Sequence, residues 1–144
     1  MSGQRAAGGG QRVPEGVQPQ GWMQPVGYAN GMSATGRIIV TAGQVGWDPV
    51  SGTFASDDFT AQTAQALRNV VAVLRAGGAG PEHLVRLTWY VTSRREYAVA
   101  RPAVGAAYRE IIGRHYPAMT VVVVSGLFEE RAKVEIEATA VVPT

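Results

Sequence analysis

Two carboxylates stand close together near the end of the chain, in the stretch AKVEIEATAVV at 132–142. A strand sends alternate side chains to opposite faces, so Val134 and Ile136 share one side while Glu135 and Glu137 share the other. On a face open to water, two neighbouring carboxylates cost little and need no function. On a covered face, desolvation and the like charge nearby raise the pKa of a carboxyl group toward the range useful for proton transfer. One of the two glutamates is therefore a candidate catalytic acid or base.

A second candidate site is TAGQVGWD at 41–48, where an apolar strand runs into small residues. Ala42 and Gly43 would let a ligand approach the backbone amides closely. The alternative interpretation is an ordinary turn. Trp47 is either a ligand-facing aromatic or a packing residue, and packing is the commoner role of an aromatic side chain after a strand.

Several other chemistries find no support in the sequence. Phosphate-loop, nucleophile-elbow and H-E-x-x-H motifs are absent. The chain has no cysteine, so it offers no thiol nucleophile and no cysteine-ligated zinc. Its two histidines, His83 and His115, lie in separate segments, which does not favour a histidine metal site. We therefore expect neither a metal nor another cofactor.

The charge and hydropathy of the sequence limit the kinds of partner that the protein is expected to bind. The net charge is +2, and the arginines are scattered singly except for Arg94 and Arg95, so no basic stripe is present to neutralise a run of phosphates. This pattern does not favour nucleic-acid binding. No segment has the apolar length of a signal-peptide core or a membrane span, so we expect a soluble, cytoplasmic protein.

The elements that must position the candidate residues follow from periodicity. Residues 1–20 are rich in Gly, Gln, Pro and Arg and are expected to be a disordered or arm-like tail, leaving 21–144 as one domain. Strands are predicted at 37–44, with 22–32 as an antiparallel partner, and at 85–92, 120–124 and 132–142. In 85–92, Trp89 and Tyr90 are adjacent and must face opposite ways, one toward the core and one toward a partner.

Two amphipathic helices are predicted between these strands. The first begins at Ser56, whose hydroxyl would cap it, carries an apolar stripe and ends at Gly77 or Gly78. The second has Pro102 in its first turn and ends at Gly113. Its apolar face is formed by Val104, Ala107, Tyr108, Ile111 and Ile112.

The resulting order, β-β-α-β-α-β-β, predicts an α+β fold with one sheet and two helices on one of its faces. The strand TVVVV at 120–124 is apolar on both faces, which is typical of a strand covered on both sides. Two helices can cover only one face of a small sheet. A second subunit is the simplest cover for the other face.

In order and spacing, several segments of the chain resemble the RidA family, also called YjgF or L-PSP proteins. These segments are GYANGM at 27–32, RIIVTAGQVGWDP at 37–49, the stretch 59–92, PAM at 117–119 and KVEIEATAVV at 133–142. The resemblance implies a chorismate-mutase-like α+β fold and a homotrimer with ligand clefts between subunits. It also implies hydrolysis of small-molecule imines and enamines, such as 2-aminoacrylate, without metal or cofactor. Some relatives have instead been described as ribonucleases or translation inhibitors.

Carried over residue by residue, the resemblance assigns the water-activating glutamate to Glu135. Tyr28 matches the family's tyrosine near the cleft, and Ala42 and Gly43 match the strand end whose backbone lines it. Trp47 lies just beyond, where the family often has a small or aliphatic residue. Glu137, further along the same face, is left to an interface or to solvent.

Three positions depart from the family pattern. Deaminases of the family have an arginine after P-A that clamps the substrate carboxylate, whereas this chain has Met119, which cannot do so. Val123 stands where active relatives often have a glutamate. An insertion at 101–105 would place Arg101 near a family polar residue at the start of the second helix. Arg101 is then either a replacement cation or a solvated arginine at a helix start.

Losing a two-pronged arginine contact would weaken recognition of a small carboxylate on the order of a hundredfold or more. We therefore expect an enzyme that hydrolyses or tautomerises a larger or uncharged imine or enamine, with Glu135 as acid or base. The alternative is a non-catalytic member of the family that binds a small molecule or a protein. Ribonuclease activity ranks third, because the sequence lacks a histidine pair and a basic groove.

Overall fold

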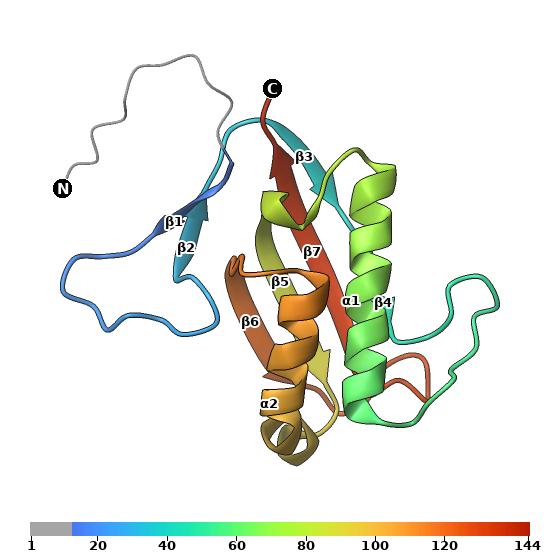
Figure 1. The fold of residues 1–144 in the computed structure, drawn as a ribbon. Helices are drawn as coiled ribbons and strands as arrows, with labels where there is room; N and C mark the ends of the chain where they lie inside the picture. Colours follow the sequence, from blue (N-terminus) through green and yellow to red (C-terminus); the bar gives the residue numbers. More distant parts are fainter. Residues whose placement is uncertain (1–12) are drawn as a thin grey trace.

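The computed structural model describes residues 13–144, in which a five-stranded main sheet is backed by two helices (Figure 1). The sheet contains β3 (Arg37–Val40), β4 (Gln44–Val45), β5 (Leu84–Val91), β6 (Ala118–Val123) and β7 (Val134–Val142). The helices are α1 (Phe59–Ala76) and α2 (Arg94–Ile111), and a short 3-10 helix, η1 (Pro81–His83), precedes β5. Two further strands, β1 (Glu15–Val17) and β2 (Gly31–Ser33), pair with each other.

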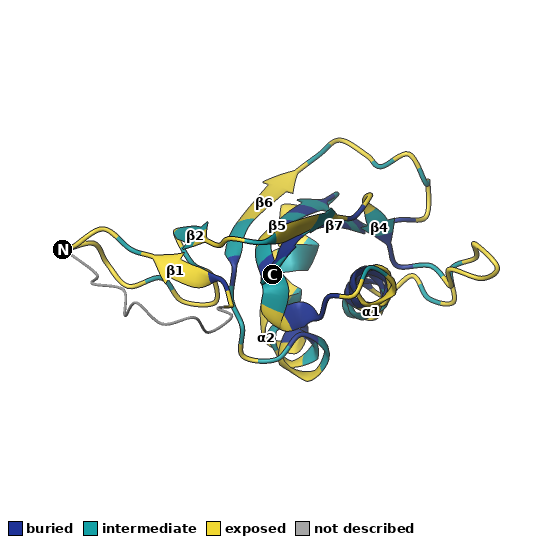
Figure 2. Ribbon diagram, turned by 90° about the horizontal axis from the view of Figure 1, so that it is seen from above, coloured by how far each residue is buried: buried dark blue, intermediate teal, exposed yellow. Residues whose placement is uncertain are grey.

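Both helices lie on one face of the sheet, as Figure 2 shows in a view along the layers. The strand order is β3-β7-β5-β6, with β4 also paired to β7. The β5–β6 pair is parallel, and all pairs to β7 are antiparallel. The predicted α+β class and its helix arrangement are therefore confirmed. We call the sheet face opposite the helices the open face.

The alternation predicted for the last strand is present in β7. Val134, Ile136, Ala138 and Ala140 are buried beneath the helices, whereas Glu135, Glu137 and Thr139 lie on the open face and are half-buried. On β5 the same rule buries Trp89 in the core and turns Tyr90 to the open face. The predicted alternation of faces in both strands is therefore confirmed, and a partner facing Tyr90 stays a prediction.

Helix α1 packs its predicted apolar stripe into the core. Thr63, Leu67, Val70, Val71 and Leu74 are all buried. The cap differs from the prediction.

The residue that caps α1 is Asp58, whose carboxylate accepts a hydrogen bond of 2.9 Å from the Ala61 amide. Ser56 instead accepts from the Asp58 amide and orders the turn before the helix. At the other end, Gly78 has φ +83°, the left-handed conformation expected there.

Helix α2 begins earlier than predicted. Ser93 caps it by accepting a hydrogen bond from the Glu96 amide, and Pro102 lies in the helix interior rather than in its first turn. Proline removes one helical hydrogen bond, here to the carbonyl four residues earlier. That carbonyl belongs to Ala98, which is exposed, so water can satisfy it. The helix therefore tolerates the proline and carries Arg101 in its middle, not at its start.

The predicted pairing of 22–32 with 37–44 was wrong. β2 pairs with β1, outside the main sheet, and β3 pairs with β7. The loop before β2 reaches the sheet through Ala29, whose amide donates to the Pro117 carbonyl at 3.0 Å. This contact holds the loop beside the start of β6.

Part of the predicted tail is ordered. Of residues 1–20, those from 1 to 12 lie outside the described part of the chain, and Glu15–Val17 form β1. Neither helix within the described residues 13–144 is long and apolar enough to cross a membrane.

Apolar side chains are also exposed on the sheet. On the open face, Ile38 and Val40 are each 67% exposed, and Val122 of β6 is 37% exposed. Val121 and Val123, on the helix side of the same edge strand, are 39% and 52% exposed. A single chain therefore leaves TVVVV without the cover that its composition predicts.

Candidate functional site

Glu135 lies on the open face beside an irregularity in the neighbouring strands. The four-residue step from Val40 to Gln44 is paired with the three-residue step from Thr139 to Ile136, so one extra residue bulges out between β3 and β4. The bulge contains Ala42 and Gly43, which are exposed. It is anchored by Thr41, whose amide donates to the Ala138 carbonyl at 2.9 Å and whose hydroxyl accepts from the Ala138 amide at 3.1 Å.

Gly43 makes room for the Glu135 carboxylate. A Cβ at position 43 would lie 2.7 Å from Cδ of Glu135 and would overlap Oε2 of the same side chain. Among the described residues, the carboxylate of Glu135 has no hydrogen-bond or ion-pair partner. We call the group Ala42, Gly43 and Glu135 the Glu135 site.

Glu137 is engaged differently. It accepts a hydrogen bond of 2.6 Å from the Tyr90 hydroxyl. That hydrogen bond is the main cause of a raised pKa of Tyr90, and partial desolvation and the charges of Glu137 and Glu135 add to it. Tyr90 is thus a neutral donor held by one glutamate, which leaves Glu135 as the member of the pair available for chemistry.

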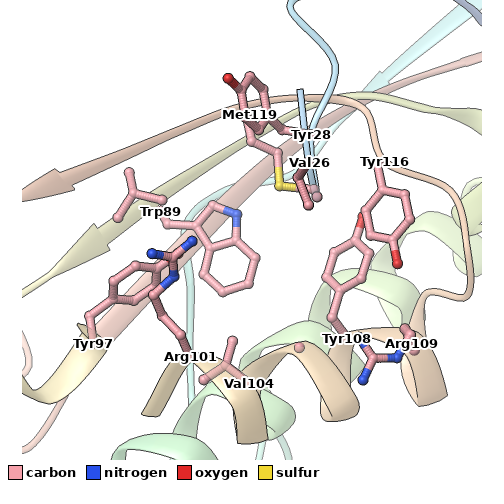
Figure 3. Close-up of a pocket in the computed structure, with 13 residues that line it drawn as sticks. Val26, Tyr28, Trp89, Tyr97, Arg101, Val104, Tyr108, Arg109, Tyr116 and Met119 are labelled. Carbon is pink, nitrogen blue, oxygen red and sulfur yellow. The ribbon is translucent and has the colours of Figure 1, made fainter. Parts of the chain in front are cut away.

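On the helix side of the sheet, a cavity of about 490 Å³ opens between β6, α2 and the loop that precedes β2 (Figure 3). We call it the α2 cavity. Its lining comprises Val26, Gly27, Tyr28, Trp89, Tyr97, Arg101, Val104, Gly105, Tyr108, Arg109, Tyr116, Met119 and Val121. The volume lies within the range of roughly 300–1,000 Å³ typical of small-molecule sites.

Aromatic rings form one wall of the α2 cavity. Tyr108 stacks on Trp89 at a centroid distance of 6.4 Å and on Tyr116 at 5.4 Å. Its hydroxyl donates to the His115 carbonyl at 2.6 Å, and burial raises the pKa of this phenol. The row of rings is therefore fixed by packing and by a hydrogen bond at its centre.

The indole nitrogen of Trp89 is a donor without an acceptor. Trp89 is 4% exposed, and its Nε1 finds no hydrogen-bond partner among the described residues. In Figure 3 this nitrogen faces the space below Met119. Leaving a buried donor unpaired costs about 1–3 kcal/mol, which a ligand acceptor would recover.

Two guanidinium groups from α2 reach the same cavity. Figure 3 shows Arg101 at the end near Tyr97 and Arg109 at the end near Tyr108. Gly105 lies between them in the helix and also lines the cavity, and a Cβ there would lie 3.4 Å from a guanidinium nitrogen of Arg109. No carboxylate lines the α2 cavity among the described residues.

The register places Met119 and Glu135 on opposite faces of the sheet. Met119 is paired with Leu87, which is buried beneath the helices, whereas Glu135 is paired with Tyr90 on the open face. The structure therefore brings Tyr28, Arg101 and Met119 together in the α2 cavity, apart from the Glu135 site. One chain does not assemble all the predicted residues into one cleft.

Two predicted ligand contacts lie elsewhere. Trp47 is half-buried, and its ring packs against Phe54 at a centroid distance of 6.0 Å. Asn69 donates to its carbonyl at 3.0 Å, so this segment is tied to α1. Val123 is 52% exposed at the end of β6 and does not line the α2 cavity, where Val121 does.

The two histidines have structural contacts. His83 Nδ1 accepts from the Gly80 amide at 2.9 Å, and His115 Nε2 lies 2.7 Å from the Leu84 carbonyl. Within residues 13–144 no group of three or more acidic or histidine side chains is arranged to hold a metal ion.

Sequence reasoning missed most of the aromatic wall. Tyr97, Tyr108 and Tyr116 were either unmentioned or assigned only to a helix face, although they surround the cavity. A signal was present in the high aromatic content around 89–116, but it cannot show which rings share a wall. The unpaired state of Trp89 Nε1 depends on side-chain packing and leaves no trace in the sequence.

A sequence model described as Endoribonuclease L-PSP matches residues 23–142. The chain therefore belongs to this family, the RidA or YjgF family. The 2-iminobutanoate/2-iminopropanoate deaminase of Salmonella typhimurium is 34% identical over 117 residues, which cover 79% of this chain and 86% of the relative.

Solved structures agree with this assignment. The conserved Rid family protein YyfB from Yersinia pestis superimposes with a TM-score of 0.77 at 33% identity, covering 91% of this chain and 100% of the other. The YjgF gene product of Escherichia coli gives a TM-score of 0.65 at 32% identity, with coverage of 79% and 87%. The family predicted from the sequence is confirmed.

Proposed function

We propose that this protein hydrolyses an imine or enamine larger than 2-aminoacrylate, in a cleft where the Glu135 site of one copy meets the α2 cavity of another. The relatives named 2-iminobutanoate/2-iminopropanoate deaminase support imine hydrolysis as the reaction class. The observation that carries the proposal is Glu135 itself, a carboxylate without a described partner beside the small-residue bulge.

Met119 and the size of the α2 cavity support a substrate other than the smallest imino acid. A thioether cannot form the two-pronged, charge-assisted contact that an arginine makes with a carboxylate. The cavity of about 490 Å³ is large for a three-carbon molecule, and its wall is aromatic. Such a wall favours a substrate with a substantial apolar or aromatic part.

Glu135 would move the protons of the reaction. It takes a proton from water as the water oxygen bonds to the imine carbon, and the C=N electron pair moves to nitrogen, which is protonated. The resulting carbinolamine loses ammonia as the C–N bond breaks, and the hydroxyl proton leaves as the C=O bond forms. Exposed backbone at Ala42 and Gly43 is placed to stabilise charge that develops beside Glu135.

A homotrimer would explain why the Glu135 site and the α2 cavity are separated within one chain. The Glu135 site and the α2 cavity lie on opposite faces of one sheet, so one cleft can contain both only if two copies contribute. The exposed Ile38, Val40 and Val122 on the open face are the apolar surface such an assembly would cover.

A coupled assay tests the proposal. An amino-acid oxidase generates the imine of phenylalanine or of alanine in situ, and semicarbazide traps what the protein leaves unhydrolysed. We expect faster hydrolysis of the phenylalanine imine than of the alanine imine. Glu135→Gln should reduce the rate on the order of a hundredfold or more, because it removes the proton carrier.

Glu137→Gln is the matched control, since Glu137 is already bonded to Tyr90, and it should retain the rate within a few-fold. An unchanged rate in Glu135→Gln would refute the role given to this residue. If neither imine is hydrolysed faster than in buffer, the second candidate function is favoured. In that case the protein is a non-catalytic binding member of the family, in keeping with Met119 at the position of the family's arginine.

A further inference from the structure

The α2 cavity combines three features that together define a ligand. It has an aromatic wall, two guanidinium groups without a lining carboxylate, and the unpaired Nε1 of Trp89. Trp89 is more than nine-tenths buried, so its N–H is not satisfied by bulk water. A complementary ligand would supply a hydrogen-bond acceptor for Trp89, a negative charge for an arginine and a flat apolar part for the wall.

We propose that the α2 cavity binds a 2-imino acid with an aromatic side chain, and its 2-oxo acid product, with the ligand carboxylate on Arg101 and the Trp89 indole N–H donating to the same ligand. The proposal rests on the function proposed above and names its substrate class. In it, the cation lost from β6 at Met119 is replaced from helix α2.

The placement of Arg101 follows from the early start of α2. Because the helix begins at Arg94, Arg101 lies two turns inside it and reaches the cavity beside Tyr97. Neither Arg101 nor Arg109 is paired with a carboxylate among residues 13–144. Arg109 lies eight residues further on, about 12 Å along the helix axis, against Gly105.

Arg101 is the better carboxylate partner of the two, because Figure 3 shows its guanidinium at the Trp89 end of the cavity. A carboxylate held there leaves the rest of the ligand to extend toward Tyr108 and Tyr116. These rings are stacked with an interplanar angle of 14° and offer a flat apolar surface. An aromatic side chain on the ligand fits this surface better than a methyl group does.

Indole NMR resonances test the proposal without requiring turnover. The chain has 3 tryptophans, so a ¹⁵N-labelled sample gives three indole N–H signals, and Trp22→Phe and Trp47→Phe assign the Trp89 signal by exclusion. Titration with phenylpyruvate, a stable 2-oxo acid, should move the Trp89 signal downfield. The Trp47 signal should stay in place, because that ring packs against Phe54 away from the cavity.

Arg101→Gln should weaken phenylpyruvate binding on the order of tenfold or more, as expected for the loss of a charge-assisted hydrogen bond. The matched control is Arg94→Gln, at the exposed start of the same helix, which should bind phenylpyruvate as the native protein does. Pyruvate should bind at least tenfold more weakly than phenylpyruvate, because it lacks the ring.

Three results would overturn the proposal: a Trp89 signal that does not move at saturating phenylpyruvate, a larger loss from Arg109→Gln than from Arg101→Gln, or equal binding of uncharged 3-phenylpropanamide. Because binding of phenylpyruvate requires no proton transfer, these outcomes do not depend on whether Glu135 is catalytic. If phenylpyruvate does not bind, the role of Glu135 in hydrolysis can still hold. If Glu135→Gln keeps the native rate, the α2 cavity can still bind the ligand.

Discussion

The two sides of this small sheet offer different chemistry. The Glu135 site on the open face presents a carboxylate next to exposed backbone, whereas the α2 cavity on the helix side presents aromatic rings, two guanidinium groups and an indole N–H. The first is suited to moving a proton and the second to holding a molecule. Because the strand register separates them, the proposed function combines the open face of one copy with the cavity of another.

Gly43→Ala is the substitution that we expect to disrupt the Glu135 site most. The backbone φ of Gly43 is not in the left-handed region, so alanine is tolerated, but its Cβ would push the Glu135 carboxylate aside. We expect the rate of imine hydrolysis to fall on the order of tenfold or more while the melting temperature changes little. Rates measured beside Gly126→Ala, a control at an exposed glycine where a Cβ would meet no atom within 4 Å, check this expectation. A fully active Gly43→Ala would show that the carboxylate position is immaterial.

Met119→Arg tests the role of the α2 cavity in substrate recognition. It returns a cation to β6, so hydrolysis of the small alanine imine should rise roughly tenfold, while that of the phenylalanine imine falls because the long side chain occupies part of the cavity. The coupled assay with both imines measures the ratio. Met119→Leu, which keeps the volume without the charge, is the control. A ratio that is the same in the Arg and Leu variants would contradict the assignment of Met119 to the substrate site.

Tyr90→Phe should have the smallest effect of these substitutions, and the effect is on stability. It removes the hydrogen bond to Glu137 and leaves Glu135 unchanged. The folded-state pKa of Tyr90 is raised, so the hydrogen bond contributes stability below the unfolded-state pKa, about 10, and this contribution is lost as pH rises through the folded value. The variant should be slightly less stable than the native protein at pH 8, and the difference should shrink above about pH 10. Urea unfolding at both pH values measures it, and a difference that grows with pH would contradict the assignment.

Much of the fold could be predicted because the relevant patterns are local. The alternation in β7 placed Glu135 and Glu137 on one face, and the stripe of α1 identified its buried side. The local rule that places proline in the first turn of a helix failed, because the surroundings of the residue compensate for the lost hydrogen bond. Pro102 lies inside α2 because the exposed Ala98 carbonyl can bond to water.

The candidate site could be predicted only in part for the same reason. Glu135 is a candidate because of its strand pattern and the family motif, whereas the position of its carboxylate beside Gly43 depends on the bulge between β3 and β4 and could not be predicted. The interaction of Tyr90 with Glu137 joins residues that are 47 positions apart. Arg101 was assigned to a helix start, and its place in the α2 cavity follows from where that helix begins.

The central claim is that the catalytic acid and the binding cavity come from different copies of the chain. Complementation tests it most directly, using Glu135→Gln, which lacks the acid, and Gly105→Phe, which adds a ring at a residue that lines the cavity. Each variant is first shown to be folded, to have the native oligomeric state and to be inactive alone. The two are then mixed in equal amounts in mild denaturant and reassembled.

If each cleft takes its acid from one copy and its cavity from the next, about one quarter of the clefts regain both native halves, and about a quarter of the native activity should return. A mixture that exchanges subunits, verified by mass spectrometry of the mixed oligomers, and remains as inactive as its components would contradict the claim. The acid and the cavity would then have to act within a single copy or not at all.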